Sequence, residues 1–145
     1  MENYFQFALQ KLQESGLKVT QPRSMIVRLL SKSKKALSPY EMKELLAKKK
    51  IKADVVTIYR VLEILEKLGL IHKVLAFNGY IACETPTLSQ KSCHHYLLCE
   101  RCHEVNEVKG EDLSCLEKKI TQTHLFEIRS HYLEFMGLCG KCRKQ

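Results

Sequence analysis

The sequence predicts an α+β chain in two parts, a helical N-terminal part and a small α/β C-terminal part. Helix signals follow one another up to Gly69, and short strand-like segments begin at Leu70. Two Cys-x-x-Cys pairs, Cys99/Cys102 and Cys139/Cys142, close the C-terminal third. A length of 145 residues and a hydrophobic content of 45% suit one compact unit or two small ones.

Charge divides the chain at the same place. Residues 1–83 carry 15 Lys/Arg and 7 Asp/Glu, whereas residues 84–145 carry nine of each, so the formal net charge of +8 lies in the first part. We therefore expect a basic domain over residues 1–84, a polar linker or hinge over 85–92 and a second domain over 93–145. A basic domain indicates a polyanionic partner, because phosphate contacts release counterions. A solvated basic surface is the alternative.

Targeting signals are absent from the sequence as read. Its apolar runs fall short of the ~20 residues that a membrane span needs, and residues 1–4 do not open a signal peptide. This predicts a cytoplasmic protein without a membrane partner, in which thiols stay reduced. The seven cysteines are therefore expected to be metal ligands before disulfides.

Helix signals organise the N-terminal part. Thr20 is a candidate N-cap followed by a proline in the first turn, and Ser38–Glu41 reads as a capping box with proline at the first helical position. Asp54 is expected to cap a further helix that stops at Gly69, and a weaker pattern predicts a first helix near residues 3–15.

The helix after Asp54 is predicted to have two different faces. At ~100° per residue, its core side gathers five apolar residues: Ile58, Val61, Leu62, Leu65 and Leu68. Val56 and Arg60 lie opposite, with Tyr59 at the flank. Arginine reaches guanine or phosphate and apolar groups meet thymine methyls, so this surface suits a DNA recognition helix. An ordinary amphipathic surface helix is the alternative.

A β-hairpin is predicted to follow that helix. Leu70–Val74 reads as a strand, Asn78-Gly79 as a two-residue turn and Tyr80–Cys83 as the returning strand. Helices followed by a hairpin make a winged helix, a common DNA-reading arrangement, in which Lys73 could contact the DNA backbone.

The C-terminal part is predicted to hold a small sheet and one helix. Strands are expected at His95–Leu98 and Glu104–Val108, and a helical pattern runs from Leu113 to His124. A third strand is expected to include Phe126, Ile128, Tyr132, Leu133 and Phe135. Such a sheet buries little by itself, so zinc and homodimerisation are the expected supplements.

Two sets of residues are candidate metal ligands. The four thiols Cys99, Cys102, Cys139 and Cys142 suit a closed tetrahedral zinc cage, with redox cysteines as the alternative. A mixed set, His72, Cys83, His94 and Glu107, would complete a tetrahedral site that bridges the two parts. Each member of the mixed set also has an ordinary explanation; Cys83, for example, could be a small buried hydrophobe.

Four motifs in order resemble the ferric uptake regulator family of bacterial metalloregulators. They are Gly-Leu-Lys-Val-Thr-Gln-Pro-Arg (16–23), Val-Thr-Ile-Tyr-Arg-Val-Leu (56–62), His-His-Tyr-Leu-Leu-Cys-Glu-Arg-Cys (94–102) and Gly-Leu-Cys-Gly-Lys-Cys (137–142). The resemblance implies a dimeric repressor with an N-terminal winged helix and a C-terminal α/β dimerisation domain. It also implies binding to palindromic, AT-rich operator DNA when the metal is bound.

Within that family the sequence is most similar to the zinc uptake regulator branch. The resemblance puts His72 and Cys83 on the regulatory zinc ligands, Glu107 on the acidic ligand and His94 on the remaining one, with His95 as its substitute. Iron and peroxide sensors usually carry a histidine where Tyr96 stands. Lacking that histidine while presenting a thiol favours zinc over Fe²⁺ or Mn²⁺.

The resemblance implies further site residues. His95 and His131 match a variable third metal site, whose usual acidic position holds Ser114. For DNA, it points to five residues: Tyr59 and Arg60 in the major groove, Lys18 in the adjacent minor groove, and Arg23 and Thr57 at phosphates.

The sequence therefore predicts a zinc-responsive transcriptional repressor of zinc uptake and homeostasis genes, not an enzyme, with no small-molecule substrate. An iron- or peroxide-responsive regulator of the same family is the nearest alternative. A zinc-containing thiol redox protein is an alternative from another class, because Cys93 and Cys115 remain after the zinc assignments. A zinc hydrolase is disfavoured because both metal sites would be filled by protein ligands.

Overall fold

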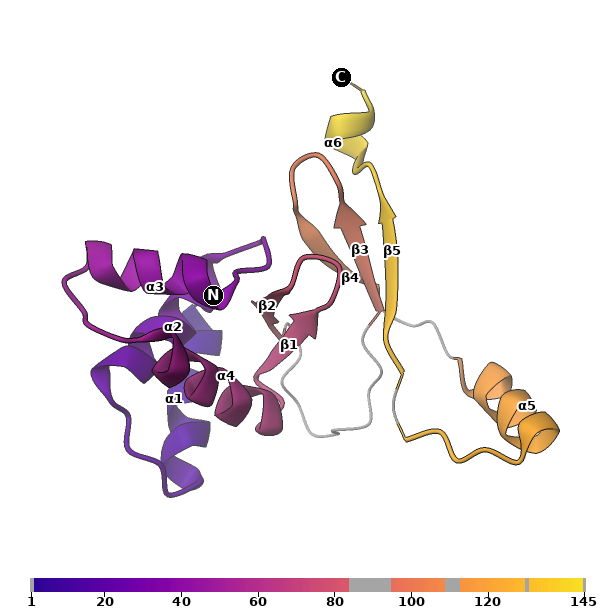
Figure 1. Cartoon of the computed structure of the whole chain (residues 1–145), viewed down its shortest axis with the longest axis horizontal. Coiled ribbons are helices and arrows are strands. Elements are labelled where there is room, and N and C mark those ends of the chain that lie inside the picture. Colours follow the sequence, from indigo (N-terminus) through magenta and orange to yellow (C-terminus); the bar gives the residue numbers. More distant parts are fainter. Residues whose placement is uncertain (1, 84–94, 109–112, 130, 145) are drawn as a thin grey trace. The chain divides into compact units, whose positions relative to one another are not determined.

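The computed structural model describes residues 2–83, 95–108, 113–129 and 131–144. The chain divides into two compact units, Met1–Leu88 and Ser89–Gln145, and each is described by itself (Figure 1). Helices and strands are both present in the order expected of an α+β chain. Among the described residues, no helix combines the length and apolar character needed to cross a bilayer.

Unit 1 is a helical cluster followed by a hairpin. Its elements are α1 (Glu2–Glu14), α2 (Gln21–Lys32), α3 (Pro39–Lys48), α4 (Val55–Lys67), β1 (Ile71–Val74) and β2 (Gly79–Ala82). The hydrophobic core joins side chains from all four helices and β1, including Leu12, Ile26, Leu30, Met42, Leu46, Ile58, Leu62, Leu65 and Ile71. Four of the five residues expected on the core side of α4 are buried, and Leu68 packs against the core half-buried.

The helix starts follow the sequence signals with one exception. The Ser38 hydroxyl accepts from the Glu41 amide at 3.2 Å and the Glu41 carboxylate accepts from the Ser38 amide at 2.7 Å, which completes the capping box. The Asp54 carboxylate accepts from the Thr57 amide at 2.7 Å. Thr20 occupies the N-cap of α2 with extended backbone, but its side chain makes no capping hydrogen bond.

Three helices of unit 1 end in the same way. After α1, α3 and α4, one residue adopts a left-handed conformation. Its backbone amide and that of the next residue donate hydrogen bonds to carbonyl oxygens near the end of the helix. The left-handed residues are Gly16, Lys50 and Gly69, with φ of 71°, 60° and 66°. The residue after each of them is apolar and packs into the core or against it. This motif turns the chain sharply towards the next element.

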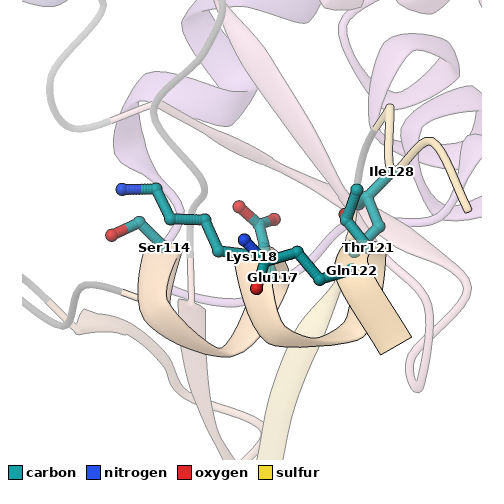
Figure 2. Close-up of a pocket in the computed structure, with 6 residues that line it drawn as sticks. All are labelled: Ser114, Glu117, Lys118, Thr121, Gln122 and Ile128. Atoms are coloured by element: carbon teal, nitrogen blue, oxygen red, sulfur yellow. The ribbon is translucent and has the colours of Figure 1, made fainter. Parts of the chain in front are cut away.

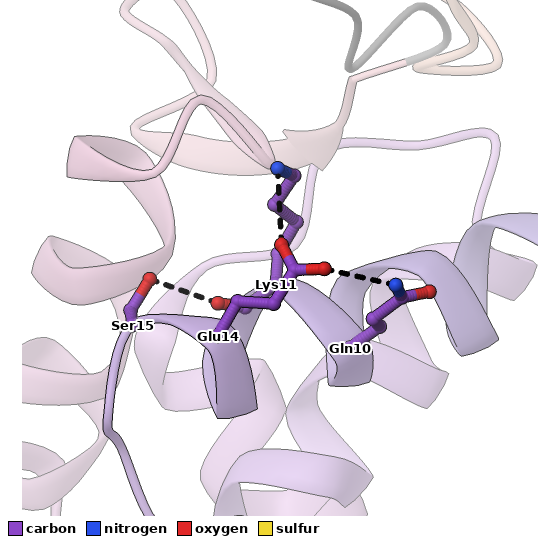
Figure 3. A network of polar contacts seen from close by, with 4 residues as sticks. All are labelled: Gln10, Lys11, Glu14 and Ser15. Atoms are coloured by element: carbon purple, nitrogen blue, oxygen red, sulfur yellow. Dashed lines mark hydrogen bonds and ion pairs between the residues drawn. The ribbon is translucent and has the colours of Figure 1, made fainter.

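Polar contacts support the end of α1 (Figure 3). Glu14 accepts from the Gln10 amide at 2.9 Å and pairs with Lys11 at 3.2 Å, while the Ser15 hydroxyl donates to the Lys11 carbonyl at 2.8 Å. The hydrogen bond from Gln10, and then the contact with Lys11, lowers the pKa of Glu14. This cluster is exposed, so its role is local.

The hairpin corrects the expected two-residue turn at Asn78-Gly79. Val74 pairs with Gly79, so the turn is formed by residues 75–78, and Gly79 already belongs to β2. A Cβ on Gly79 would lie 3.1 Å from the Ala36 Cβ and from the Leu37 carbonyl carbon. The glycine is needed because the α2–α3 connection approaches β2 this closely, where Leu37 forms a two-bond bridge with Tyr80.

Unit 2 holds a three-stranded sheet in the order β4-β3-β5, with β3 (His95–Cys99) antiparallel to β4 (Val105–Val108) and parallel to β5 (Leu133–Gly137). Helix α5 (Ser114–His124) precedes β5, and the short α6 (Gly140–Arg143) follows it. Phe126, Ile128 and Tyr132 were expected in the third strand, and this is wrong. The parallel register starts where Leu133 pairs with His95, so these three residues lie in the connection between α5 and β5.

Helix α5 buries none of its residues within the protomer. Its side chains nevertheless divide into two sets. Ser114, Glu117, Lys118, Thr121 and Gln122 follow one polar stripe, whereas Leu116 and Ile120 are exposed by 52% and 37%. An amphipathic helix with an exposed apolar stripe needs a further surface to cover it.

Candidate metal centres and DNA-binding surface

The four expected cage thiols converge in unit 2. The Sγ atoms of Cys99, Cys102, Cys139 and Cys142 all lie within 4.8 Å of one another, and the Cys102 and Cys139 sulfurs are 3.8 Å apart. Four sulfurs about 2.3 Å from a tetrahedral zinc ion would lie about 3.8 Å from one another. The residues present therefore fit a structural zinc ion in both chemistry and spacing.

Two short turns hold this cage. Cys99 ends β3, and the turn after it closes when the His103 amide donates to the Cys99 carbonyl at 2.8 Å, with His103 in a left-handed conformation. Cys139 is the N-cap of α6, which carries Cys142. The Arg101 guanidinium donates to the Cys142 carbonyl at 2.8 Å and joins the two turns. The Cys-x-x-Cys spacing predicted the thiols, but nothing in it identified Arg101.

The thiols differ in acidity. Backbone hydrogen bonds from the Cys102 amide and then from the Cys139 amide lower the pKa of Cys99 to about 6. Burial, followed by hydrogen bonding among the sulfurs, raises the pKa of Cys142 to about 12. Cys99 is thus a ready thiolate, while Cys142 keeps its proton at neutral pH unless a cation replaces it.

His72 and Cys83 share one face of the hairpin in unit 1. His72 pairs with Ile81 in the ladder, and Cys83 follows Ile81 by two residues, so the alternation of side chains puts both candidate ligands on the same side. Such diagonal neighbours lie about 7–8 Å apart at Cα. Cys83 is only 2% exposed, and His72 is half-buried.

One carbonyl anchors the Cys83 end of this hairpin. The Leu70 oxygen accepts from the Cys83 amide at 2.9 Å and from the Tyr4 hydroxyl at 2.5 Å. Burial, and then the neighbouring Cys83, raises the pKa of Tyr4 well above its usual range, so the phenol stays a hydrogen-bond donor. The first helix is thereby tied to a candidate ligand, a link that the sequence pattern did not reveal.

The remaining mixed-site residues belong to unit 2. Glu107 on β4 pairs with Tyr96 on β3, so it lies on the face of the sheet opposite to His95. Glu134 on β5 also pairs with Tyr96 and shares the Glu107 face. His94 and Cys93 lie outside the described residues.

His95 and His131 come together, as the third-site resemblance implies. Their Nε2 atoms are 3.1 Å apart, and the His131 Nδ1 lies 2.6 Å from a Glu117 carboxylate oxygen. Glu117 is one helical turn beyond Ser114 on the same face of α5, so its carboxylate lies close to the position that Ser114 holds. Glu117 was not among the residues that the sequence pattern indicated, although its i, i+3 spacing from Ser114 was a usable signal.

A shallow hollow of about 300 Å³ lies along the polar stripe of α5, bordered on one side by Ile128 (Figure 2). Glu117 is one of its lining residues and is already paired with His131. Apart from Ile128, the other residues that line the hollow, among them Lys118 and Gln122, come from successive turns of α5. The hollow is therefore the open flank of α5.

The expected DNA-contacting surface belongs to unit 1. On α4, Val56 is 58% exposed, Tyr59 is 38% exposed and Arg60 is exposed, whereas Thr57 is half-buried. Asp54, by accepting from the Thr57 amide, holds the first turn that presents these side chains. The exposed groups are the hydrogen-bonding and apolar types that read a major groove.

The other two expected contacts are linked to each other. Arg23, at the start of α2, donates to the Lys18 carbonyl at 2.6 Å, and the Thr20 amide donates to the same carbonyl at 3.1 Å. Lys18 itself is exposed. Arg23 therefore fixes the loop that presents Lys18, in addition to any phosphate contact of its own.

Comparison with known proteins agrees with this geometry. A model of the ferric uptake regulator family matches residues 14–136. The chain belongs to the ferric uptake regulator family. Members of this family are transcription regulators and not enzymes. The resemblance inferred from the four sequence motifs is thus confirmed.

Relatives in this family include both iron and zinc regulators. The ferric uptake regulation protein of Neisseria gonorrhoeae is 31% identical over 144 residues, which cover 99% of this chain and 96% of that protein. The zinc uptake regulation protein of Escherichia coli K12 is 29% identical over 132 residues, covering 89% and 75%. A solved zinc uptake regulator complexed with zinc and DNA matches 99% of this chain and 95% of its own, at 26% identity and a TM-score of 0.88.

Proposed function

We propose that this ferric uptake regulator family member is a zinc-dependent transcriptional repressor that acts in the cytoplasm as a homodimer on AT-rich, palindromic operators of zinc uptake genes. The observation that carries the zinc assignment is Cys83, a buried thiol on the same hairpin face as His72. A thiolate among the ligands favours zinc over Fe²⁺ or Mn²⁺.

The proposed sensing site combines His72 and Cys83 from unit 1 with His94 and Glu107 from unit 2. A bound zinc ion would supply a cross-link between the two units. His95 is a weaker candidate than His94, because it lies on the opposite sheet face from Glu107 and already contacts His131. The four residues together would favour the DNA-competent arrangement, and by linkage DNA would tighten zinc binding.

The proposed DNA contacts follow from the exposed surface of unit 1. Tyr59 and Arg60 would read the major groove, while Lys18 would enter the adjacent minor groove. Arg23 and Thr57 would meet phosphates. A winged helix of this kind binds as a dimer to two half-sites, so the dimer in unit 2 sets their spacing.

A binding experiment with metal buffers tests the sensing site. The full chain, retaining its structural zinc, would be titrated with AT-rich inverted-repeat duplexes by fluorescence anisotropy at buffered Zn²⁺ or anaerobic Fe²⁺. We expect tight binding at far lower free Zn²⁺ than Fe²⁺. Cys83→Ser should abolish the zinc response, and Cys115→Ser, which removes an exposed thiol on α5, should retain it.

Two results would contradict the proposal. A response to iron alone would assign the chain to the iron or peroxide regulators and release Cys83 from its role. An unchanged zinc response in Cys83→Ser would show that the thiol is not a ligand.

We also propose that His95, His131 and Glu117 form the third metal site of this chain. Two imidazoles and a carboxylate that already converge are a donor set suited to zinc. Native mass spectrometry of the zinc-loaded protein should show one metal fewer per protomer in Glu117→Gln than in Ser114→Ala. Equal metal content in the two variants would rule this site out.

A further inference from the structure

A lysine segment of unit 1 has no part in the sites described above. It runs from the last residue of α3 into the connection to α4, and its four lysines are all exposed: Lys48, Lys49, Lys50 and Lys52. Ile51, in their midst, is 6% exposed and anchors the segment to the core. None of the four ammonium groups forms an ion pair with a carboxylate in the described ranges of the chain. Their charge is therefore available to an external anion.

Lys50 occupies a backbone position at which the fold alone would favour glycine. The Lys50 amide donates to the Ala47 carbonyl and the Ile51 amide to the Leu46 carbonyl, at 2.9 and 3.0 Å. The ends of α1 and α4 repeat this pair of bonds with Gly16 and Gly69 at the left-handed residue. A side chain at φ 60° crowds the backbone, whereas glycine does not. Lysine at this position therefore carries a backbone strain that glycine would avoid.

The segment lies next to the recognition helix along the chain. Lys52 precedes the Asp54 N-cap by two residues and Val56 by four. An extended chain spans at most ~3.5 Å per residue, which puts the Lys52 Cα within about 14 Å of the Val56 Cα. The major groove is about 12 Å wide. When the first turns of α4 enter the groove, the residues just before them are therefore within reach of the phosphates along its edge.

We propose that the ammonium groups of this lysine segment bind DNA phosphates beside the groove that α4 enters, and thereby raise the affinity for DNA of any sequence. The inference rests on the DNA binding proposed above. Interaction with the C-terminal helix dipole accounts for Lys48 and Lys49 at the end of α3. It does not account for Lys52, which lies beyond the helix, or for a lysine at the left-handed position.

The salt dependence of DNA binding tests this role. The zinc-loaded full chain would be titrated with two duplexes, an AT-rich inverted repeat selected from random sequence and a scrambled duplex, between 50 and 200 mM KCl. The slope of log K against log salt is negative, and each phosphate contact that is lost reduces its magnitude by about 0.9. We expect Lys50→Gln/Lys52→Gln to reduce the magnitude of this slope by up to about 1.8 per protomer. Affinity for both duplexes should fall by the same factor.

Two further variants separate charge from structure. Lys118→Gln/Lys119→Gln removes the same charge from α5 of unit 2 and should leave the slope near that of the wild type. Lys50→Gly should melt at a higher temperature, because glycine adopts the left-handed conformation without strain. It should nevertheless bind both duplexes more weakly, because the ammonium group is lost. A stabilised Lys50→Gly with unchanged affinity and slope would overturn the proposal.

The scrambled duplex separates failure of this inference from failure of the proposed function. Wild-type protein that binds both duplexes with strong salt dependence but no response to zinc would contradict the sensing site alone. The lysine variants are then compared on the scrambled duplex. If Lys50→Gln/Lys52→Gln matches the Lys118→Gln/Lys119→Gln control there, the lysine segment does not contact DNA.

Discussion

A single carbonyl oxygen, that of Leu70, links the N-terminal helix to the candidate sensing thiol. It accepts hydrogen bonds from the Tyr4 hydroxyl and the Cys83 amide, which lie 66 and 13 residues away along the chain. Because both donors use the same oxygen, we expect a change at Tyr4 to shift the strand end that carries Cys83. The position of this candidate ligand should therefore depend on packing by α1.

Tyr4→Phe tests this link. The substitution removes the hydrogen bond and keeps the ring, so we expect unit 1 to lose about 0.5–1.5 kcal/mol in its free energy of unfolding. Zinc-dependent DNA binding should require a higher free Zn²⁺ concentration. Tyr40→Phe is the matched control, because Tyr40 is 64% exposed. Urea denaturation together with metal-buffered anisotropy measures both effects, and equal results for the two variants would contradict the link.

The acidity of the cage thiols predicts how zinc retention depends on pH. Cys142, with its pKa raised to about 12, carries a proton in the metal-free site at pH 7. At Cys102 the hydrogen bond from the Glu104 amide, which lowers the pKa, is outweighed by the hydrogen bond with the Cys99 sulfur and then by burial, so the pKa is raised. Zinc must displace such protons, so its affinity should rise with pH, by about tenfold per unit for each proton released. Chelator competition between pH 6 and 8 measures this slope. A flat profile would mean that the thiols are already ionised.

At the scale of elements, the wing of unit 1 is shaped by what packs against it. Gly79 lies in β2 because the Leu37 backbone passes close beside it, and Leu37 and Tyr80 exchange two hydrogen bonds of 2.9 Å. The connection between α2 and α3 thus acts as a short third strand. It holds the hairpin, with His72 and Cys83, against the helices.

Gly79→Ala should disrupt that contact. The new methyl group would lie 3.1 Å from backbone and side-chain carbons on the α2–α3 connection, and we expect a loss of about 1–3 kcal/mol in stability. Gly137→Ala is the control, because a Cβ there meets nothing within 4 Å. Thermal unfolding compares the two variants. Equal melting temperatures would show that the connection moves aside without cost.

At the scale of the whole molecule, unit 2 is incomplete as a single protomer. Leu97 and Phe135 pair across β3 and β5 on the sheet face that carries His95, and they are 48% and 51% exposed. His131 contacts both His95, on this face, and Glu117, on α5. These contacts tie α5 to the same face of the sheet. Leu116 and Ile120 of α5 are exposed as well. We expect a second copy of the chain to cover this apolar surface, since so small a core needs a partner.

Charge placed on this surface should therefore separate the dimer. We expect Phe135→Glu to be monomeric by light scattering and to bind operator DNA much more weakly, because two half-sites are no longer engaged together. Met136→Glu is a close control: Met136 is 55% exposed but lies on the opposite face of β5. A dimeric Phe135→Glu variant, or a monomeric Met136→Glu variant, would assign the dimer contact to another surface.

Local chemistry explains what the sequence by itself determined about this chain. The caps at Ser38 and Asp54, the stop at Gly69, most of the core side of α4 and the two Cys-x-x-Cys pairs follow from short spacings, and the structure agrees with them. That the two pairs meet is decided by the fold of unit 2. Residues within one turn or one Cys-x-x-Cys unit act on each other whatever the rest of the chain does. The same spacings carried the family resemblance.

Tertiary structure alone decided the features that depend on distant segments. Glu117 meets His131 because the fold brings α5 to it, and Gly79 serves a close approach instead of a turn. Tyr4 meets Leu70 across the core, and β5 starts at Leu133 because β3 sets its register. In each case the partner lies many residues away, so the outcome depends on packing that no local pattern encodes.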